Sequence, residues 1–290
     1  MEKENPYRFE ERVYNDGIFS NGQRSTVDAT YIIHLEGNER LKKVNHELDM
    51  IHPTNLVFIL HNKGFRGGGK AGFIKSAPQD LIDCYIQVFK HARERKYENI
   101  LVLEDDFFWN MDILEKDHIT DISNFLLEKR GKDFLYLLGC LPVLQIPATF
   151  TGEHCLGLSL GTHAVIYSRK CRERVLDVDQ STMGDWDVFH NFNSLRYFYY
   201  QPLCYQLFPN TENQTKWLSG YLPTVLQMAI LYLIVLPFFR ILSLDEKVDP
   251  GYTFFYRCSL YISILSMCLI LLIVYSIYQI KWFKRNVRLV

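Results

Sequence analysis

The stretch Ile100-Leu101-Val102-Leu103-Glu104-Asp105-Asp106 joins four apolar residues directly to three acidic ones. Four consecutive apolar residues predict a short strand that is buried on both faces. Further strands are predicted over residues 31–35, 56–60, 134–138 and 162–167, and helices over 40–50, 80–96, 111–130 and 170–178. This alternation predicts an α/β domain with a mainly parallel central sheet.

The composition changes close to Trp217, which divides the chain into two unlike parts. Residues 1–27 are polar and predict a loose N-terminal arm, and residues 28–215 predict the α/β domain. Beyond it, 218–239 and 258–280 are uncharged runs of 22 and 23 residues, close to the roughly 20 that cross a bilayer core. We therefore expect transmembrane helices over 218–242 and 253–280, joined by a short loop, 243–252, and followed by a basic tail, 281–290.

Three features predict on which side of the membrane the domain lies. The chain opens without an apolar signal segment, and its seven cysteines lack the spacing of a disulfide framework, which is typical of reduced thiols. The tail carries four basic residues, which the positive-inside rule places in the cytosol; they are Lys281, Lys284, Arg285 and Arg288. Two spans would return the chain to its starting side, so we expect a two-span membrane protein whose domain is cytosolic.

The acidic triplet is the sharpest candidate site. Ligands of open α/β sheets bind beyond the carboxyl ends of the strands, which is where Glu104-Asp105-Asp106 follows its strand. Glu104 and Asp106 have one residue between them, so both can turn toward one point. Carboxylate oxygens suit a hard cation, Mg²⁺ or Mn²⁺, with phosphate completing its shell. The alternative is a solvated acidic turn or the first turn of a helix.

Three other segments carry weaker signals. The glycine-rich loop 64–70 ends in Lys70 and could hold phosphate through its backbone, or it could be a mobile surface loop. Asp185 or Asp187 could act as a general base, although Asp185 also suits a helix cap. His163 could line the site or join a metal shell, although a single histidine in a strand more often has a structural role.

Taken together, these segments resemble the family 25 glycosyltransferases, which include lipooligosaccharide and collagen galactosyltransferases. The resemblance covers about residues 30–210 and rests on the order and spacing of five segments. They are Ile33-His34-Leu35-Glu36-Gly37-Asn38-Glu39-Arg40, Leu101-Val102-Leu103-Glu104-Asp105-Asp106, Gly161-Thr162-His163-Ala164-Val165-Ile166-Tyr167-Ser168-Arg169, Asp185-Trp186-Asp187 and Pro202-Leu203-Cys204-Tyr205-Gln206. His34 stands where the family has asparagine, and the glycine-rich loop and the C-terminal spans lie outside the family pattern.

The resemblance implies a GT-A fold, a nucleotide-sugar donor and a Mn²⁺-type cation, with Mg²⁺ as the alternative. It implies that Glu104 and Asp106 hold the metal and the donor diphosphate. Arg40, Lys70, Asp105 and His163 are the expected donor or phosphate contacts, and Asp185 or Asp187 is the expected base. The composition, rich in isoleucine, asparagine and tyrosine, would suit a large DNA virus or a protist.

The sequence thus predicts a membrane-anchored, metal-dependent hexosyltransferase. Its acceptor would be a hydroxyl of a glycan, protein or lipid, its membrane partner a lipid bilayer, and no nucleic-acid partner is expected. Two alternatives stay open. One is a membrane scaffold that kept the glycosyltransferase fold without catalysis, and the other is a nucleotidyltransferase, which also uses paired acids and a metal.

Overall fold

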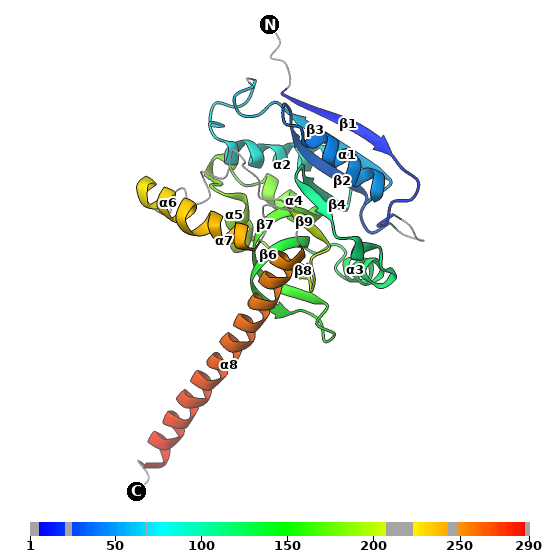
Figure 1. The fold of residues 1–290 in the computed structure, drawn as a ribbon. Coiled ribbons are helices and arrows are strands. Elements are labelled where there is room, and N and C mark those ends of the chain that lie inside the picture. The colour runs from blue at the N-terminus through cyan, green and yellow to red at the C-terminus, as the bar shows by residue number, and fades with distance from the viewer. Residues whose placement is uncertain (1–5, 21–24, 68, 207–222, 243–248, 288–290) are drawn as a thin grey trace.

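The computed structural model describes residues 6–20, 25–67, 69–206, 223–242 and 249–287. Its centre is a seven-stranded sheet with the strand order β1-β3-β2-β4-β7-β6-β8 (Figure 1). The strands of this sheet are β1 Tyr7–Val13, β2 Ala29–Leu35, β3 Leu56–Asn62, β4 Asn99–Glu104, β6 Leu135–Pro147, β7 His154–Ser168 and β8 Arg196–Tyr199. The α/β class expected from the sequence is therefore confirmed.

The sheet is mixed. Strand β2 pairs in parallel with β3 and with β4, and β6 pairs in parallel with β8. Strand β1 runs antiparallel to β3, and β7 runs antiparallel to both β4 and β6. The expected parallel pairing thus holds for β3-β2-β4, whereas β6 and β7 form one long hairpin. Its two strands are much longer than the short runs 134–138 and 162–167 that their apolar residues predict, because their outer halves are partly exposed and contain prolines, glycines and single polar residues.

The polar N-terminal arm is the first correction. Tyr7–Val13 forms β1, which lies at the sheet edge against β3. Tyr7 is buried and Phe9 packs on the core, whereas the intervening charged residues face outward. Edge strands of natural proteins often carry such charges, which discourage pairing with other chains. The same charges hide the strand in the sequence.

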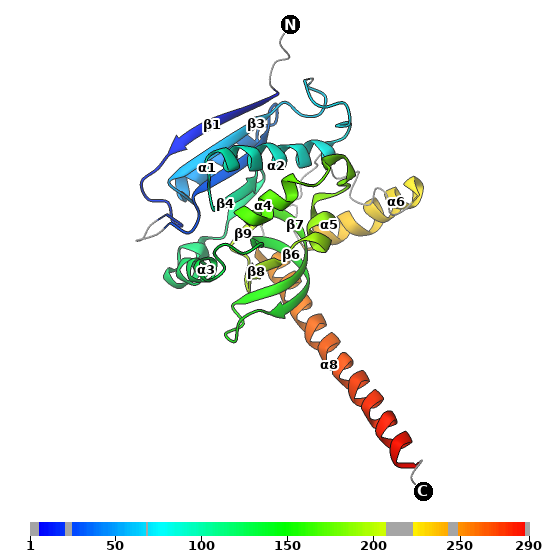
Figure 2. The same ribbon diagram turned by 180° about the vertical axis from the view of Figure 1, so that it is seen from behind.

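Helices cover both faces of the sheet (Figures 1 and 2). Helices α2 Ala77–Glu94, α4 Arg169–Leu176 and α5 Trp186–Asn193 supply residues to one buried cluster. Helices α1 Arg40–Met50 and α3 Lys116–Glu128 supply the cluster on the other face. Two short 3-10 helices also lie in the domain, η1 Met111–Leu114 and η2 Gln180–Thr182. The four helices predicted from apolar spacing are all present, with boundaries shifted by a few residues.

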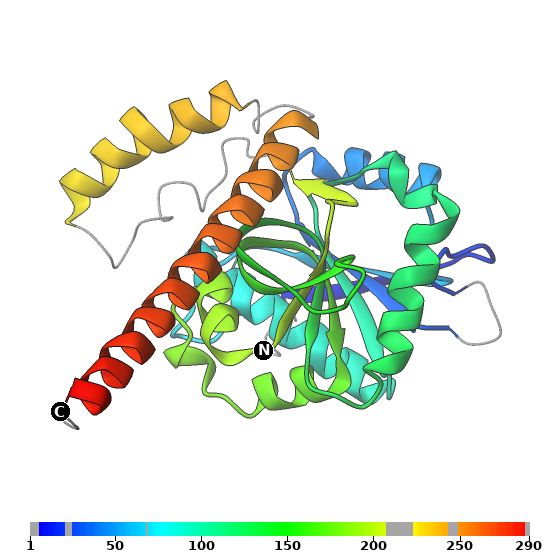
Figure 3. The same cartoon turned by 90° about the horizontal axis from the view of Figure 1, so that it is seen from below.

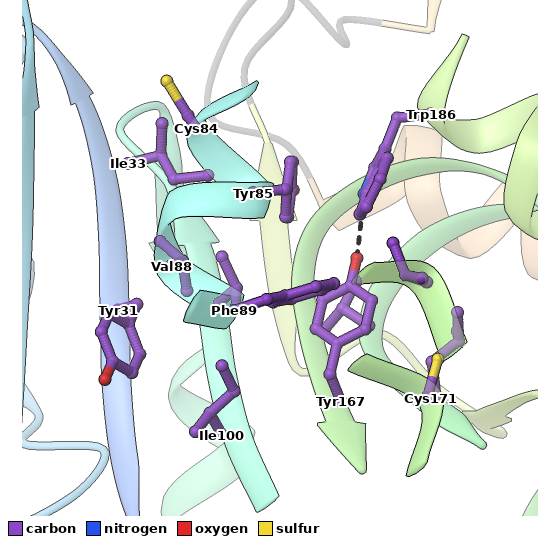
Figure 4. Packing of buried hydrophobic residues seen from close by; sticks show 14 of the residues in the cluster. Tyr31, Ile33, Cys84, Tyr85, Val88, Phe89, Ile100, Tyr167, Cys171 and Trp186 are labelled. Atoms are coloured by element: carbon purple, nitrogen blue, oxygen red, sulfur yellow. Dashed lines mark hydrogen bonds between the residues drawn. The ribbon is translucent and has the colours of Figure 1, made fainter. Parts of the chain in front are cut away.

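An aromatic group fixes the start of α5 (Figure 4). The indole of Trp186 stacks on the ring of Tyr85 with centroids 4.5 Å apart, and its Nε1 donates to the hydroxyl of Tyr167 at 3.0 Å. Such stacks add stability beyond the area they bury. Because α5 begins at Trp186, this packing also fixes the direction of the next side chain, Asp187.

A second, two-stranded sheet lies beside the end of β4. Strand β5 Phe107–Trp109 pairs antiparallel with β9 Cys204–Gln206, and Phe107 is opposite Gln206. This register places the end of β9 next to Asp106.

The C-terminal region supports one of the two predicted spans. Among the described residues, one helix contains a segment long and apolar enough to cross a membrane by length and composition, Gly251–Trp282 within α8 Asp249–Val287. The first predicted span, 218–242, begins outside the described residues, and its described part consists of α6 Thr224–Ile230, the π-helical η4 Leu231–Val235 and α7 Leu236–Ile241. These elements are short, and Pro237 removes a backbone donor within them.

The prediction of a cytosolic domain depended on two spans. Because the described residues contain one candidate span, that prediction is not supported. Part of the expected loop, 243–248, lies outside the described residues, as do the ends of the arm and the tail at 1–5 and 288–290. The other part of that loop is helical, because α8 begins at Asp249. Figure 3 shows α8 running beneath the domain and then away from it.

The first turns of α8 are packed on the domain. Tyr252, Tyr256, Ser259 and Ser263 are buried and recur at spacings of four, three and four residues, which places them on one helix face. From Ile264 to Trp282 the described side chains are exposed or half-buried. Helix α8 therefore has a docked base and a projecting apolar part.

Candidate functional site

The acidic triplet lies at the carboxyl edge of the parallel strands, as expected. Glu104 is the last residue of β4, and β2, its parallel neighbour, ends at the same edge. Tyr85 brings its hydroxyl within 3.0 Å both of Glu104 Oε1 and of the carbonyl of Thr162 on β7. One hydroxyl proton therefore serves two acceptors, and α2, β4 and β7 meet at Glu104.

Asp105 holds this edge together. Its Oδ2 accepts from His34 Nδ1, from the Leu35 amide and from Asn38 Nδ2, at 3.0, 3.1 and 3.0 Å. Its Oδ1 accepts from Arg40 Nη1 at 2.8 Å. Although burial opposes the effect, these donors and the charge of Arg40 lower the pKa of Asp105 below its ordinary value. Asp105 thus joins β2 and α1 to β4, and His34, where the resemblance expects asparagine, supplies one of the donors.

Glu104 and Asp106 have the opposite electrostatics. Burial, together with the charges of Asp106 and Asp187, raises the pKa of Glu104 to about 8. Burial and the charge of Asp105 raise the pKa of Asp106 to about 6, although Arg40, 3.3 Å away, opposes this. A raised carboxyl pKa means that the surroundings disfavour the ionised form, here chiefly through burial and also through the neighbouring acids.

The Gln206 amide lies between these two carboxylates. Its Nε2 donates to Asp106 Oδ1 at 3.0 Å and approaches Glu104 Oε2 at 3.5 Å. This side-chain amide therefore bridges the two acids through hydrogen bonds. The sequence places Gln206 in a family-like segment but does not identify it as a site residue.

The two candidate bases have different environments. Asp185 is exposed, and its side chain caps α5 by accepting from the Val188 amide at 2.9 Å. Asp187 Oδ2 accepts from the Gly161 amide at 2.8 Å, whereas its buried Oδ1 has no hydrogen-bond partner among the described residues. Burial raises the pKa of Asp187, and its charge acts on Glu104. Asp187, and not Asp185, therefore belongs to the acidic cluster.

His163 is fully buried and neutral. Burial lowers its pKa to about 4, and its Nε2 lies 3.2 Å from the carbonyl of Cys204 on β9. Its other nitrogen, Nδ1, has no hydrogen-bond partner in the described part of the chain. Gly139 makes this arrangement possible, since an added Cβ there would lie 1.9 Å from the Cys204 carbonyl and 2.5 Å from His163 Nε2. The histidine joins β7 to β9 beneath the site.

Lys70, an expected phosphate contact, lies in a buried ion pair. Its ammonium is bonded to Asp80 on α2 and to Asn62 at the end of β3, and it stands over the Tyr7 ring at 4.4 Å. Its side chain is only 3% exposed. The glycine-rich loop has no regular secondary structure in its described part, and the buried pair fixes its end to the domain.

These residues fit a hard divalent cation. The donor set consists of the carboxylate oxygens of Glu104 and Asp106, which are the ligands that hard cations prefer. No group of three or more histidine, cysteine or acidic side chains with metal-binding geometry is found among the described residues. A cation here would therefore take few ligands from the protein and the others from a bound phosphate or water.

The base of α8 forms part of the framework of the site. Tyr252 is buried, and its hydroxyl accepts from the backbone N–H of Gln206 at 2.8 Å and donates to the backbone carbonyl of Gln206 at 2.7 Å. Its ring also meets His163 edge-on, with centroids 6.1 Å apart. The sequence places Tyr252 in a loop between two spans, and only a contact 46 residues away along the chain reveals this role.

Replacing Tyr252 by phenylalanine is expected to lower the free energy of unfolding by about 1–3 kcal/mol, because the substitution removes two buried hydrogen bonds and leaves Gln206 backbone groups without that partner. Thermal unfolding of the full chain in detergent micelles measures the change. Tyr261→Phe is the matched control, because Tyr261 lies on the same helix and is 63% exposed. Equal unfolding temperatures for the two variants would contradict a structural role for the Tyr252 hydroxyl.

Comparisons with known proteins leave the family open. Neither a family model nor a curated protein matches the chain. The fold is similar to that of a glycosyltransferase involved in glycosylation of the major capsid of PBCV-1, at 8% identity and a TM-score of 0.37, covering 72% of this chain and 100% of that one. It is also similar to A197 from STIV, at 11% identity and a TM-score of 0.34, covering 64% and 87% of the two chains.

A third similar structure is mannose-1-phosphate geranyltransferase from Thermus thermophilus, at 10% identity and a TM-score of 0.33, covering 60% of this chain and 73% of that one. Because the TM-scores are below 0.5, these similarities do not assign a reaction to this chain. The resemblance to family 25 remains an expectation from the sequence motifs.

Proposed function

We propose that this chain is a membrane-anchored glycosyltransferase that moves a hexose from a nucleotide-sugar to an acceptor hydroxyl with the help of Mn²⁺ or Mg²⁺. The observation that carries the proposal is the pairing of Glu104 and Asp106 around the Gln206 amide, at the carboxyl edge of β2 and β4. Both pKa values are raised there. A cation bound to a diphosphate satisfies such a pair, because it supplies the positive charge that the site lacks.

Glu104 and Asp106 would hold the cation, which, once bound, neutralises charge on the departing diphosphate. Arg40 donates to both Asp105 and Asp106, and its side chain is 23% exposed. It therefore keeps the acidic turn in place and lies where it can also face a phosphate. Asp105, saturated by four donors, orients this turn and is not free to bind the donor.

Asp187 is the base in this proposal. The carboxylate of Asp187 takes the proton of the acceptor hydroxyl while the acceptor oxygen bonds to the sugar C1. The bond from C1 to the phosphate oxygen breaks, and the diphosphate leaves with the electron pair. Such a direct displacement inverts the configuration at the sugar C1. The acceptor hydroxyl belongs to a glycan, a protein or a lipid.

The direct test incubates the full chain, in membranes, with a panel of nucleotide-sugars and Mn²⁺ and measures release of nucleoside diphosphate, with and without a chelator. We expect release from one class of donor, and we expect the chelator to abolish it. Failure to bind or cleave every donor would favour a non-catalytic scaffold. Pyrophosphate formed from a sugar phosphate and a nucleoside triphosphate would identify a nucleotidyltransferase.

A further inference from the structure

The outer end of the β6–β7 hairpin carries no charge over seven residues and exposes two large apolar side chains. This hairpin end consists of Ile146-Pro147-Ala148-Thr149-Phe150-Thr151-Gly152. Phe150 is fully exposed and Ile146 is 43% exposed. Phe150 has no role in packing the domain, and with the exposed Ile146, Pro147 and Ala148 it makes a continuous exposed segment that a partner could cover.

The hairpin end begins where α8 leaves the domain. The backbone amide of Gln145 donates to Ser263 Oγ at 2.7 Å, and its side chain donates to the Tyr256 carbonyl at 2.9 Å. Ser263 is the last buried residue of α8 among those described. Gln145 on the hairpin therefore lies beside the point on α8 beyond which the helix no longer packs on the domain.

The bilayer must begin close to this point if α8 crosses it. Residues 264–280 carry no charge, and at 1.5 Å per residue they span about 26 Å, close to the roughly 30 Å of a bilayer core. Little of the apolar helix can then remain outside the membrane. Figures 1 and 2 show the hairpin end and the projecting part of α8 on the same side of the domain.

We propose that the hairpin end, Ile146 to Gly152, is a second membrane contact that inserts Phe150 into the interface of the bilayer crossed by α8. Strand β6 continues for two residues beyond Gln145, which at about 3.3 Å per residue is roughly 7 Å, and the turn that carries Phe150 lies beyond its end, so the hairpin end can enter the headgroup region. A lipid surface is the partner that suits an uncharged, apolar turn beside a transmembrane helix. Two contacts, unlike one helix, fix the tilt of the domain on the membrane.

This inference rests on the membrane-anchoring part of the proposed function and not on the transfer reaction. Its test places a benzophenone residue in the full chain, reconstituted in phosphatidylcholine vesicles, and measures photo-crosslinking to lipid. Three positions are compared in separate variants. They are Phe150, Leu269 on the projecting part of α8, which is 59% exposed, and Val13 on the edge strand β1, which is 68% exposed and lies at the end of the sheet opposite β6 and β8.

We expect lipid crosslinks at positions 150 and 269, each at least about tenfold above position 13, because only these two sites would lie in the lipid phase. Crosslinking at 269 alone would overturn the hairpin contact and leave the span intact. Crosslinking at neither position would remove the span itself. Equal crosslinking at 150 and 13 would show nonspecific adsorption and would also overturn the inference. Because Phe150 is fully exposed, its replacement leaves the fold intact.

Discussion

Replacing Asp106 by asparagine is expected to lower the cation-dependent rate of sugar transfer by at least about a hundredfold, because the variant loses one of two carboxylates that would hold the charge-stabilising cation. Asparagine keeps the shape of the side chain, so the fold should persist. The measurement is nucleoside diphosphate release by the full chain across a range of Mn²⁺ concentrations. Asp112→Asn is the matched control, because Asp112 is exposed on η1. Full turnover by the Asp106 variant would remove the metal assignment.

The pH dependence of cation binding tests the pair Glu104 and Asp106 independently. Without a cation, Glu104 keeps its proton up to a pKa of about 8 and Asp106 up to about 6. A cation must displace these protons, so its apparent affinity should rise by about tenfold per pH unit between pH 6 and 8, where one proton is released. Calorimetric titration of the wild-type chain with Mn²⁺ at several pH values measures this slope. A flat profile would contradict a site formed by Glu104.

The same shifts have a consequence for stability, with a definite sign. Glu104 has a folded-state pKa of about 8, against an ordinary value of 4.5. Its contribution to stability is therefore complete below about pH 4.5 and is lost as pH rises through 8. A bound cation reverses this trend, since it favours the ionised form. Added Mn²⁺ should thus raise the unfolding temperature more at pH 8 than at pH 6.

The acidic site could be predicted from the sequence because its central residues are contiguous. A buried strand that runs into Glu104-Asp105-Asp106 places three carboxylates at one sheet edge, whatever the rest of the fold does. The sequence could not separate their roles. Asp105 becomes structural only because His34, Asn38 and Arg40 converge on it after β2 pairs with β4.

Residues that reach the site through distant pairings could not be found in this way. Gln206 lies in a three-residue strand, and Tyr252 lies at the start of a helix that its composition assigns to the membrane. Each is brought to the site by tertiary contacts that leave no local pattern. Lys70 shows the reverse case, since a cation after glycines suggests a phosphate contact, whereas the fold supplies Asp80 as its partner.

The pair Asp185 and Asp187 shows how one helix boundary decides a chemical role. With α5 beginning at Trp186, Asp185 becomes the cap and its carboxylate is committed to the Val188 amide. Asp187, one position inside the helix, turns toward the Gly161 amide and the acidic cluster. The sequence alone allows either residue to be the base.

Asp187→Asn is therefore expected to lower the turnover number by at least about a hundredfold, with little change in the KM for the donor. The reason is that an amide cannot take the proton from the acceptor hydroxyl. The fold should be retained, since the amide keeps the hydrogen bond from Gly161. Asp185→Ala should instead lower the free energy of unfolding by about 1 kcal/mol, as loss of a helix cap does, and keep its turnover. Steady-state kinetics and thermal unfolding of both variants, in membranes and in micelles, separate the two roles. If turnover falls in Asp185→Ala and persists in Asp187→Asn, the base lies at the helix cap and the role proposed for Asp187 is wrong.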